Sequence, residues 1–128
     1  GGGIDPSKDK QRKKHEVKKQ QADTFEIIAN EWWEARKSAW TENHANSVKR
    51  SLKQNVFPVL GKRPVADISP QEILQVIKRI ETRGAHEIAS KVLQRCNGVY
   101  RYAITTSRTI HNPAADLREA LKTPEKKN

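Results

Sequence analysis

Residues 69–84 of the sequence read SPQEILQVIKRIETRG. Ser69, followed by Pro70 and then by Glu72, is the pattern of a helix start with a capping box. Gly84 is typical of a helix end, because glycine readily adopts the left-handed backbone that follows a last helical turn. The apolar side chains between these ends recur at helical spacing: Ile73, Leu74, Ile77 and Ile80. The stretch therefore predicts an amphipathic helix with one buried face.

The longest predicted helix follows directly and runs from about His86 to Thr106. Its apolar positions keep the same period and should face the core: Ile88, Val92, Cys96, Val99, Tyr100, Ala103 and Ile104. Beyond it, Asn112-Pro113 predicts the start of a short fifth helix that continues through Leu117 and Leu121.

Another helix is predicted near the beginning of the chain. Asp23 or Thr24 can cap it, since either side chain can accept a backbone hydrogen bond. The break at Trp40-Thr41 marks its end. Its inward positions are Phe25, Ile28, Ala29, Trp32 and Ala35.

The next helix is capped by Thr41 or Asn43 and ends at Phe57-Pro58, because a residue before proline avoids the helical region. Its apolar stripe is Ala45, Val48, Leu52 and Val56. Residues 59–68 then form a compact turn. Since no Asn-Gly or Asp-Gly hairpin signal occurs in the chain, the sequence predicts an all-α fold, a bundle of four helices with a short fifth C-terminal helix.

Composition limits the classes of function. The 128 residues carry 25 Lys plus Arg against 15 Asp plus Glu, a net charge of +10, and only 34% are hydrophobic. This charge indicates a polyanionic partner, with nucleic acid first and an anionic membrane surface second. No apolar run reaches the length of a membrane span, and the single cysteine excludes an internal disulfide and a multi-cysteine zinc site.

The charge is uneven along the chain. Residues 8–19 hold seven basic side chains and one apolar side chain, Val17, so residues 1–22 are predicted to be a disordered basic linker. Residues 23–121 carry 15 basic and 11 acidic side chains and are predicted to be the folded domain. Residues 122–128 are predicted to be a second linker, because Pro124 stops a helix there.

Two of the helices carry the candidate nucleic-acid contacts. The helix before Trp40 is rich in glutamate and is not expected to face a polyanion, whereas the helices after Thr41 and after His86 are basic. At 100° per residue, the exposed side of each mixes cations for phosphates with short polar groups for base edges. The candidates are Asn43, His44, Ser47, Arg50 and Lys53 on the first of these helices, and Lys91, Gln94, Arg95 and Arg101, with Gly98 among them, on the second.

Several stretches resemble the core-binding domain of phage-type tyrosine recombinases, and more narrowly the integrases of satellite prophages and genomic islands. They are Thr24-Phe25 through Trp32, Trp40-Thr41, residues 57–65, Ile68-Ser69, residues 99–104 and Asn112-Pro113-Ala114, with Gly3-Ile4-Asp5-Pro6 similar to the end of that subgroup's arm-binding domain. The order and spacing of these pieces carry the resemblance.

This resemblance implies a SAM-like four-helix domain that forms half of a clamp around core-site double-stranded DNA in a bacterial cytoplasm. In such recombinases the second and fourth helices face the major groove, which adds Thr41 to the candidates. The family usually has arginine where this chain has Lys91, and lysine lacks the planar fork that reads bases, so a phosphate contact is expected there.

The resemblance also implies that the cleaving chemistry lies elsewhere. The family's arm-binding domain is missing before Gly3 and its catalytic domain after Asn128, and no His-x-x-Arg stretch occurs. Tyr100 and Tyr102 are expected not to act as nucleophiles, with Tyr100 packing in the core.

No metal or cofactor is expected. The expected partners are DNA, a catalytic domain and other integrase protomers, and this fragment is expected to be a monomer. Two alternatives stay open: a helical protein-interaction module with a solubilising basic tail, and a polybasic membrane-surface segment.

Overall fold

The computed structural model describes residues 23–121. Its elements in chain order are α2 (Phe25–Arg36), the 3-10 turn η1 (Lys37–Ala39), α3 (Glu42–Asn55), α4 (Phe57–Leu60), η2 (Val65–Asp67), α5 (Pro70–Thr82), α6 (His86–Thr105) and η3 (Leu117–Ala120). Within this range there is no strand, and one isolated bridge joins Thr24 to Pro64. The predicted all-α fold is confirmed. Both predicted linkers, including the basic run at 8–19, lie outside the described residues.

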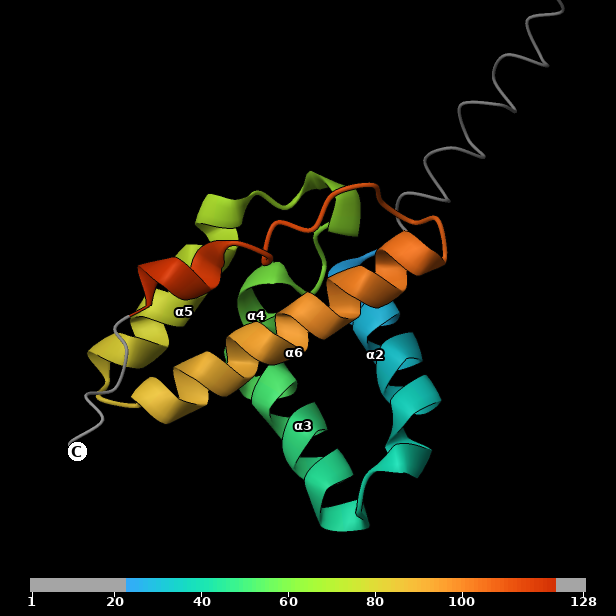
Figure 1. The fold of residues 1–128 in the computed structure, drawn as a ribbon, viewed down its shortest axis with the longest axis horizontal. Helices are drawn as coiled ribbons and strands as arrows, with labels where there is room; N and C mark the ends of the chain where they lie inside the picture. The colour runs from blue at the N-terminus through green and yellow to red at the C-terminus, as the bar shows by residue number, and fades with distance from the viewer. Residues whose placement is uncertain (1–22, 122–128) are drawn as a thin grey trace, which may run out of the picture.

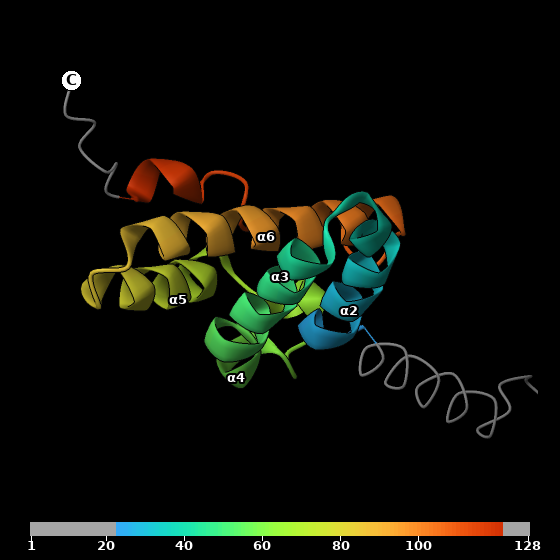
Figure 2. The same cartoon turned by 90° about the horizontal axis from the view of Figure 1, so that it is seen from below.

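Helix α6 is the central element of the fold. It lies across α2 and α3, and α5 runs beside it (Figure 1). From below, α5, α3 and α2 are all seen on the same side of α6, with α5 running beside it and α3 crossing it at an angle (Figure 2). The α2–α3 hairpin is thus held against one flank of α6, and α3 and α6 face each other.

The predicted helix ends are found in the structure. Thr24 and Thr41 are the caps, and their hydroxyl oxygens accept from the backbone N–H groups of Ile27 and His44. Ser69 forms the complete capping box of α5 with Glu72. Gly84, just beyond the end of α5, has a φ of 83°, a conformation that glycine adopts without steric cost.

Two short segments differ from the prediction. Helix α3 ends at Asn55, close to the predicted stop, but Phe57 is itself helical and begins one further turn, α4. Proline occupies the first turn of α4, where it loses no hydrogen bond. The C-terminal helix begins at Leu117 rather than at Asn112-Pro113. Here the Asn112 side chain accepts from the backbone N–H of Ala114 at 3.0 Å, and such a local bond competes with helix formation.

The core is formed mainly by the predicted stripes. Phe25, Val48, Ile77 and Cys96 are at most 1% exposed, and the hydroxyl of buried Tyr100 donates to the carbonyl of Val65 at 3.0 Å. Three predicted core positions are wrong, since all three are exposed: Ala35, Ile88 and Ile104. The last two lie about 80° to either side of Cys96 around α6, and Ala89 and Leu93 occupy the stripe between them.

Gly98 is half-buried and lies against α2, a contact that the sequence does not predict. A Cβ atom built on Gly98 would lie 2.9 Å from Cζ2 of Trp32, and Trp32 is only 5% exposed. The missing side chain therefore allows α2 and α6 to approach each other closely. This contact sets where the end of α2 lies relative to α6.

Candidate nucleic-acid interface

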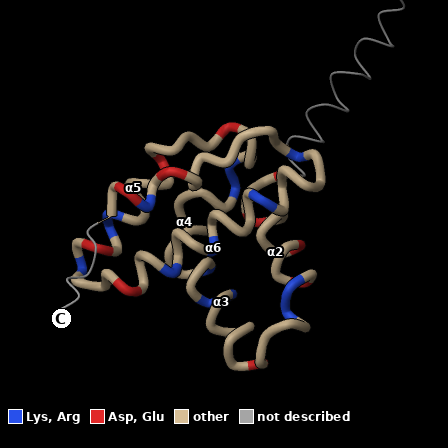
Figure 3. The backbone as a smooth tube through the Cα atoms, viewed as in Figure 1, with Lys and Arg blue, Asp and Glu red and all other residues tan. Residues whose placement is uncertain are grey.

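A hollow of about 1050 Å³ lies between α3 and α6 and is lined at one end by residues from the end of α2. Its described lining contains six cationic side chains and no carboxylate. The six are Arg36, Arg50, Arg83, Lys91, Arg95 and Arg101. Along α3 the only acidic position is in the first turn, whereas acidic and basic positions alternate on α5 (Figure 3). The unbalanced positive charge of the described domain therefore lies on the side of the hollow.

The same lining carries neutral polar groups that can both donate and accept hydrogen bonds. They are Ser47, Ser51, Gln54, Asn55, Gln94 and Asn97. Amide and hydroxyl side chains of this kind match the donor and acceptor patterns of base edges, while guanidinium and ammonium groups match phosphates. The hollow has both kinds within one concave surface.

Seven of the ten candidates from the sequence line this hollow. They are His44, Ser47, Arg50, Lys91, Gln94, Arg95 and Arg101. Thr41, Asn43 and Lys53 do not line it, although all three are exposed on or next to α3. The Thr41 hydroxyl is already used, since it accepts from the backbone N–H of His44 at 3.1 Å.

Sequence reasoning missed four lining residues that matter for the geometry: Arg36, Arg83, Ser51 and Asn55. The sequence assigns the first helix no face toward a polyanion, but the last residue of α2, Arg36, lines the hollow. Arg36 lies one turn after Trp32. Because Trp32 packs against Gly98 of α6, the last turn of α2 lies close enough to α6 for Arg36 to line the hollow. A helical wheel of α2 alone contains no such information.

The cations in the hollow differ in what they already bind. Nη1 of Arg95 donates to Oγ of Ser51 at 2.6 Å, and Nη2 of Arg83 donates to Oδ1 of Asn55 at 2.9 Å. Partial burial lowers the pKa of the Arg95 guanidinium below its ordinary value. By contrast, Arg50 and Arg101 make no side-chain hydrogen bond or ion pair with any residue that the structure describes.

Aromatic rings close one end of the hollow. The ring centroids of Trp32 and Trp40 are 5.5 Å apart, and those of Trp40 and His44 are 5.3 Å apart, both with edge-to-face geometry. Such pairs hold ring orientation through the quadrupole of each ring. His44 is thereby oriented at the first turn of α3.

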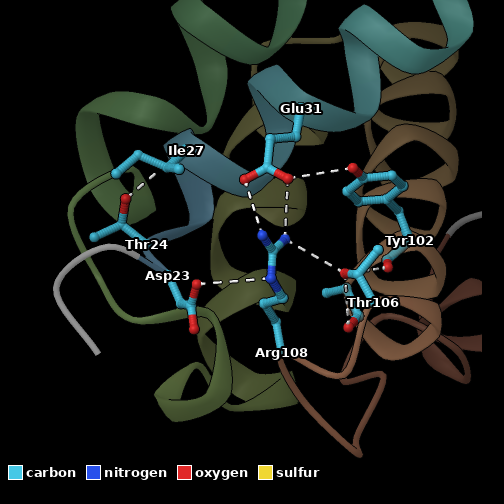
Figure 4. A network of polar contacts seen from close by, with 8 residues as sticks. Asp23, Thr24, Ile27, Glu31, Tyr102, Thr106 and Arg108 are labelled. Carbon is cyan, nitrogen blue, oxygen red and sulfur yellow. Dashed lines mark hydrogen bonds and ion pairs between the residues drawn. The ribbon is translucent and has the colours of Figure 1, made fainter. Parts of the chain in front are cut away.

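Arg108, which follows the end of α6, binds acidic side chains near the start of the described domain. Its guanidinium donates to both carboxylate oxygens of Glu31, at 3.1 and 3.3 Å, and its Nε lies 3.9 Å from Asp23 (Figure 4). The hydroxyl of Tyr102 donates to the same Glu31 carboxylate at 3.2 Å. This network joins α2 to the end of α6 and does not line the hollow.

The family model of the phage integrase central domain matches residues 25–120. The chain belongs to this family. The matched residues cover nearly all of the described domain, including every residue that lines the hollow.

Among its relatives, the prophage integrase IntS of Escherichia coli K12 is 39% identical over 126 residues, and the integrase of Shigella phage Sf6 is 38% identical over 126 residues. Both matches cover 98% of this chain, which spans 31% of the length of each relative.

Solved structures have the same fold. A fragment of IntS solved by NMR has a TM-score of 0.69 at 33% identity, covering 84% of this chain and 98% of the fragment. An integrase-like domain from Bacillus cereus has a TM-score of 0.75 at 16% identity, covering 84% of this chain and 91% of that domain, and this likeness concerns the fold alone. The helix arrangement is thus that of integrase domains. In the part of the chain that the structure describes, every helix is too short or too polar to cross a membrane.

Proposed function

We propose that residues 23–121 are the core-binding domain of a site-specific tyrosine recombinase and hold double-stranded attachment-site DNA against the hollow between α3 and α6. The observation that carries this proposal is the lining of the hollow, which contains six cationic side chains and no carboxylate among the described residues. Duplex DNA has a dense array of phosphates, so cations gathered on one concave face supply affinity. Relatedness to integrases supports the same reading.

In this proposal the cationic lining residues bind phosphates and the neutral polar ones contact base edges. Arg50, Lys91 and Arg101 bind phosphates, and Lys91 reaches out from an exposed pair with Glu87 at 3.4 Å. The short polar groups of Ser47 and Gln94, together with His44, face base edges in the major groove. Asn43, Thr41 and Lys53 extend the contact along the exposed side of α3.

The cleavage and rejoining of DNA are assigned to other parts of the recombinase and to other protomers, and not to the tyrosines of this domain. Tyr100 is fully buried, and burial raises the pKa of its hydroxyl well above the ordinary value. Burial and the hydrogen bond to Glu31 also raise the pKa of Tyr102. A phenol held neutral in this way is a poor nucleophile.

A titration of the 128-residue chain with core-site duplex, with a scrambled duplex and with anionic vesicles tests the proposal. We expect the core-site duplex to bind most tightly, with an affinity that falls steeply between two salt concentrations. If the chain bound both duplexes equally well, it would bind DNA only as a non-specific polycation, and the core-site part of the proposal would be wrong. Binding of vesicles in preference to duplex would favour the membrane-surface alternative, and binding of neither would favour a protein-interaction module.

A further inference from the structure

One arginine of the hollow is engaged before any ligand arrives. Oγ of Ser51 accepts from Nη1 of Arg95 at 2.6 Å and donates to the carbonyl of Val48 at 2.9 Å. The hydroxyl therefore has a defined direction, with its proton on α3 and its lone pair toward α6. Arg95 is half-buried, unlike exposed Arg50 and Arg101.

A second bond of the same type lies one helical turn further along α3. Nη2 of Arg83 donates to Oδ1 of Asn55 at 2.9 Å, and Nδ2 of Asn55 donates to the carbonyl of Ser51 at 2.9 Å. Arg83 lies between α5 and α6, and Arg95 lies within α6. Two guanidinium groups thus cross from the α5–α6 side to successive turns of α3.

We infer that Arg95 and Arg83 are positioning residues that tie α3 to α6 and set the separation of the two helices, while Arg50 and Arg101 contact the phosphates. The inference rests on the proposed function. If Arg95 moved to a phosphate, it would lose a short charge-assisted hydrogen bond, and the partly buried Ser51 hydroxyl would lose a donor. Arg50 has no such partner among the described residues and can bind a phosphate without this loss.

The salt dependence of binding separates the two roles. The slope of log affinity against log salt counts the phosphates that a protein neutralises, at about 0.9 per phosphate on duplex DNA. Loss of a phosphate contact lowers both the affinity and this slope. Loss of a positioning residue lowers the affinity through misplaced helices and leaves the slope unchanged, because the number of neutralised phosphates stays the same.

The experiment compares the unsubstituted chain with Ser51→Ala, Arg95→Ala, the Ser51→Ala/Arg95→Ala double variant and Arg50→Ala, using core-site duplex at several salt concentrations. We expect Ser51→Ala and Arg95→Ala each to weaken binding by about 3- to 30-fold with an unchanged slope, and the double variant to bind no worse than Arg95→Ala. Arg50→Ala should lower the slope by about one unit. Ser51→Thr, which keeps the hydroxyl, should restore binding.

A lower slope in Arg95→Ala together with normal binding by Ser51→Ala would overturn the inference and make Arg95 a phosphate contact. Additive losses in the double variant would also overturn it. Both results leave the proposed function standing, whereas failure of the unsubstituted chain to bind duplex removes the function and the inference together. If Arg95→Ala does not fold, Ser51→Ala still tests the inference, because it removes the hydroxyl without changing the charge. Normal affinity of Ser51→Ala for the duplex would contradict the inference.

Discussion

The Arg108 guanidinium donates to both carboxylate oxygens of Glu31, at 3.1 and 3.3 Å, and so joins the end of α6 to α2 across 77 positions of sequence. Arg108→Ala removes this forked contact and leaves the half-buried carboxylate without its cation. We expect the free energy of unfolding to fall by about 1–3 kcal/mol, as measured by urea denaturation. The salt slope of duplex binding should not change, because Arg108 does not line the hollow.

Lys37→Ala is the control for this loss of charge. Lys37 pairs with Glu34 at 2.7 Å, but both side chains are about half exposed, and exposed pairs of this kind contribute little. Equal destabilisation by the two substitutions would contradict a structural role for the Glu31–Arg108 pair.

Arg50→Ala should weaken binding to duplex DNA by about fivefold at 0.15 M salt, which corresponds to one phosphate contact at the slope expected for duplex DNA. Lys49→Ala is the matched control, since it removes the same charge from the preceding residue of the same helix. Lys49 lies over the ring of Trp33 and not in the hollow. Equal weakening by both variants, measured by fluorescence anisotropy, would make net charge rather than the hollow responsible for binding.

Arg36→Glu should weaken duplex binding more than Lys37→Glu, although both reverse one charge. Arg36 lines the hollow, and Lys37, its neighbour, does not. This expectation is opposite to that from the sequence, which assigns the first helix no part in DNA contact. If the two reversals have equal effects in the same titration, Arg36 lies outside the bound surface.

Gly98→Ala should destabilise the domain, because the added Cβ would lie 2.9 Å from a ring atom of buried Trp32. Overpacking of this kind costs about 1–3 kcal/mol. Gly84→Ala is a useful comparison, since nothing lies within 4 Å of its added Cβ and only its φ of 83° opposes alanine, at about 1 kcal/mol. Thermal unfolding should show Gly98→Ala as the less stable variant, and a neutral Gly98→Ala would contradict the close approach of α2 and α6.

The sequence predicted the helices well because their signals are local. Caps such as Thr41 and Ser69, and apolar stripes repeated every three to four residues, depend on neighbours within one or two turns. The same locality explains the errors at Ile88 and Ile104. At the two edges of a stripe, burial depends on how far the neighbouring helices extend around α6, and the periodicity of one helix does not contain that information.

The candidate site was predicted in part for the same reason. Polar faces of α3 and α6 follow from their helical wheels, and seven candidates line one hollow. Arg36 and the bond between Arg95 and Ser51 depend on how two helices meet, 44 positions apart in the second case. A wheel shows that Arg95 is off the core side, but not that its guanidinium is already bound.

Cys96 gives a prediction on pH. Its side chain is 1% exposed, and burial raises the pKa of the thiol to about 12, while an unfolded cysteine titrates near 8.5–9. Because the folded pKa is the higher one, this contribution to stability is complete below about pH 8 and is lost as the unfolded state ionises. Between pH 7 and 9.5 the free energy of unfolding should fall by about 1 kcal/mol more in the unsubstituted chain than in Cys96→Ala. Comparing the two proteins at each pH cancels the titration of lysines and tyrosines. If the difference in the free energy of unfolding between the two proteins stayed constant across this range, the fold would not hold the thiol neutral. Rapid reaction of Cys96 with a thiol reagent under native conditions would lead to the same conclusion.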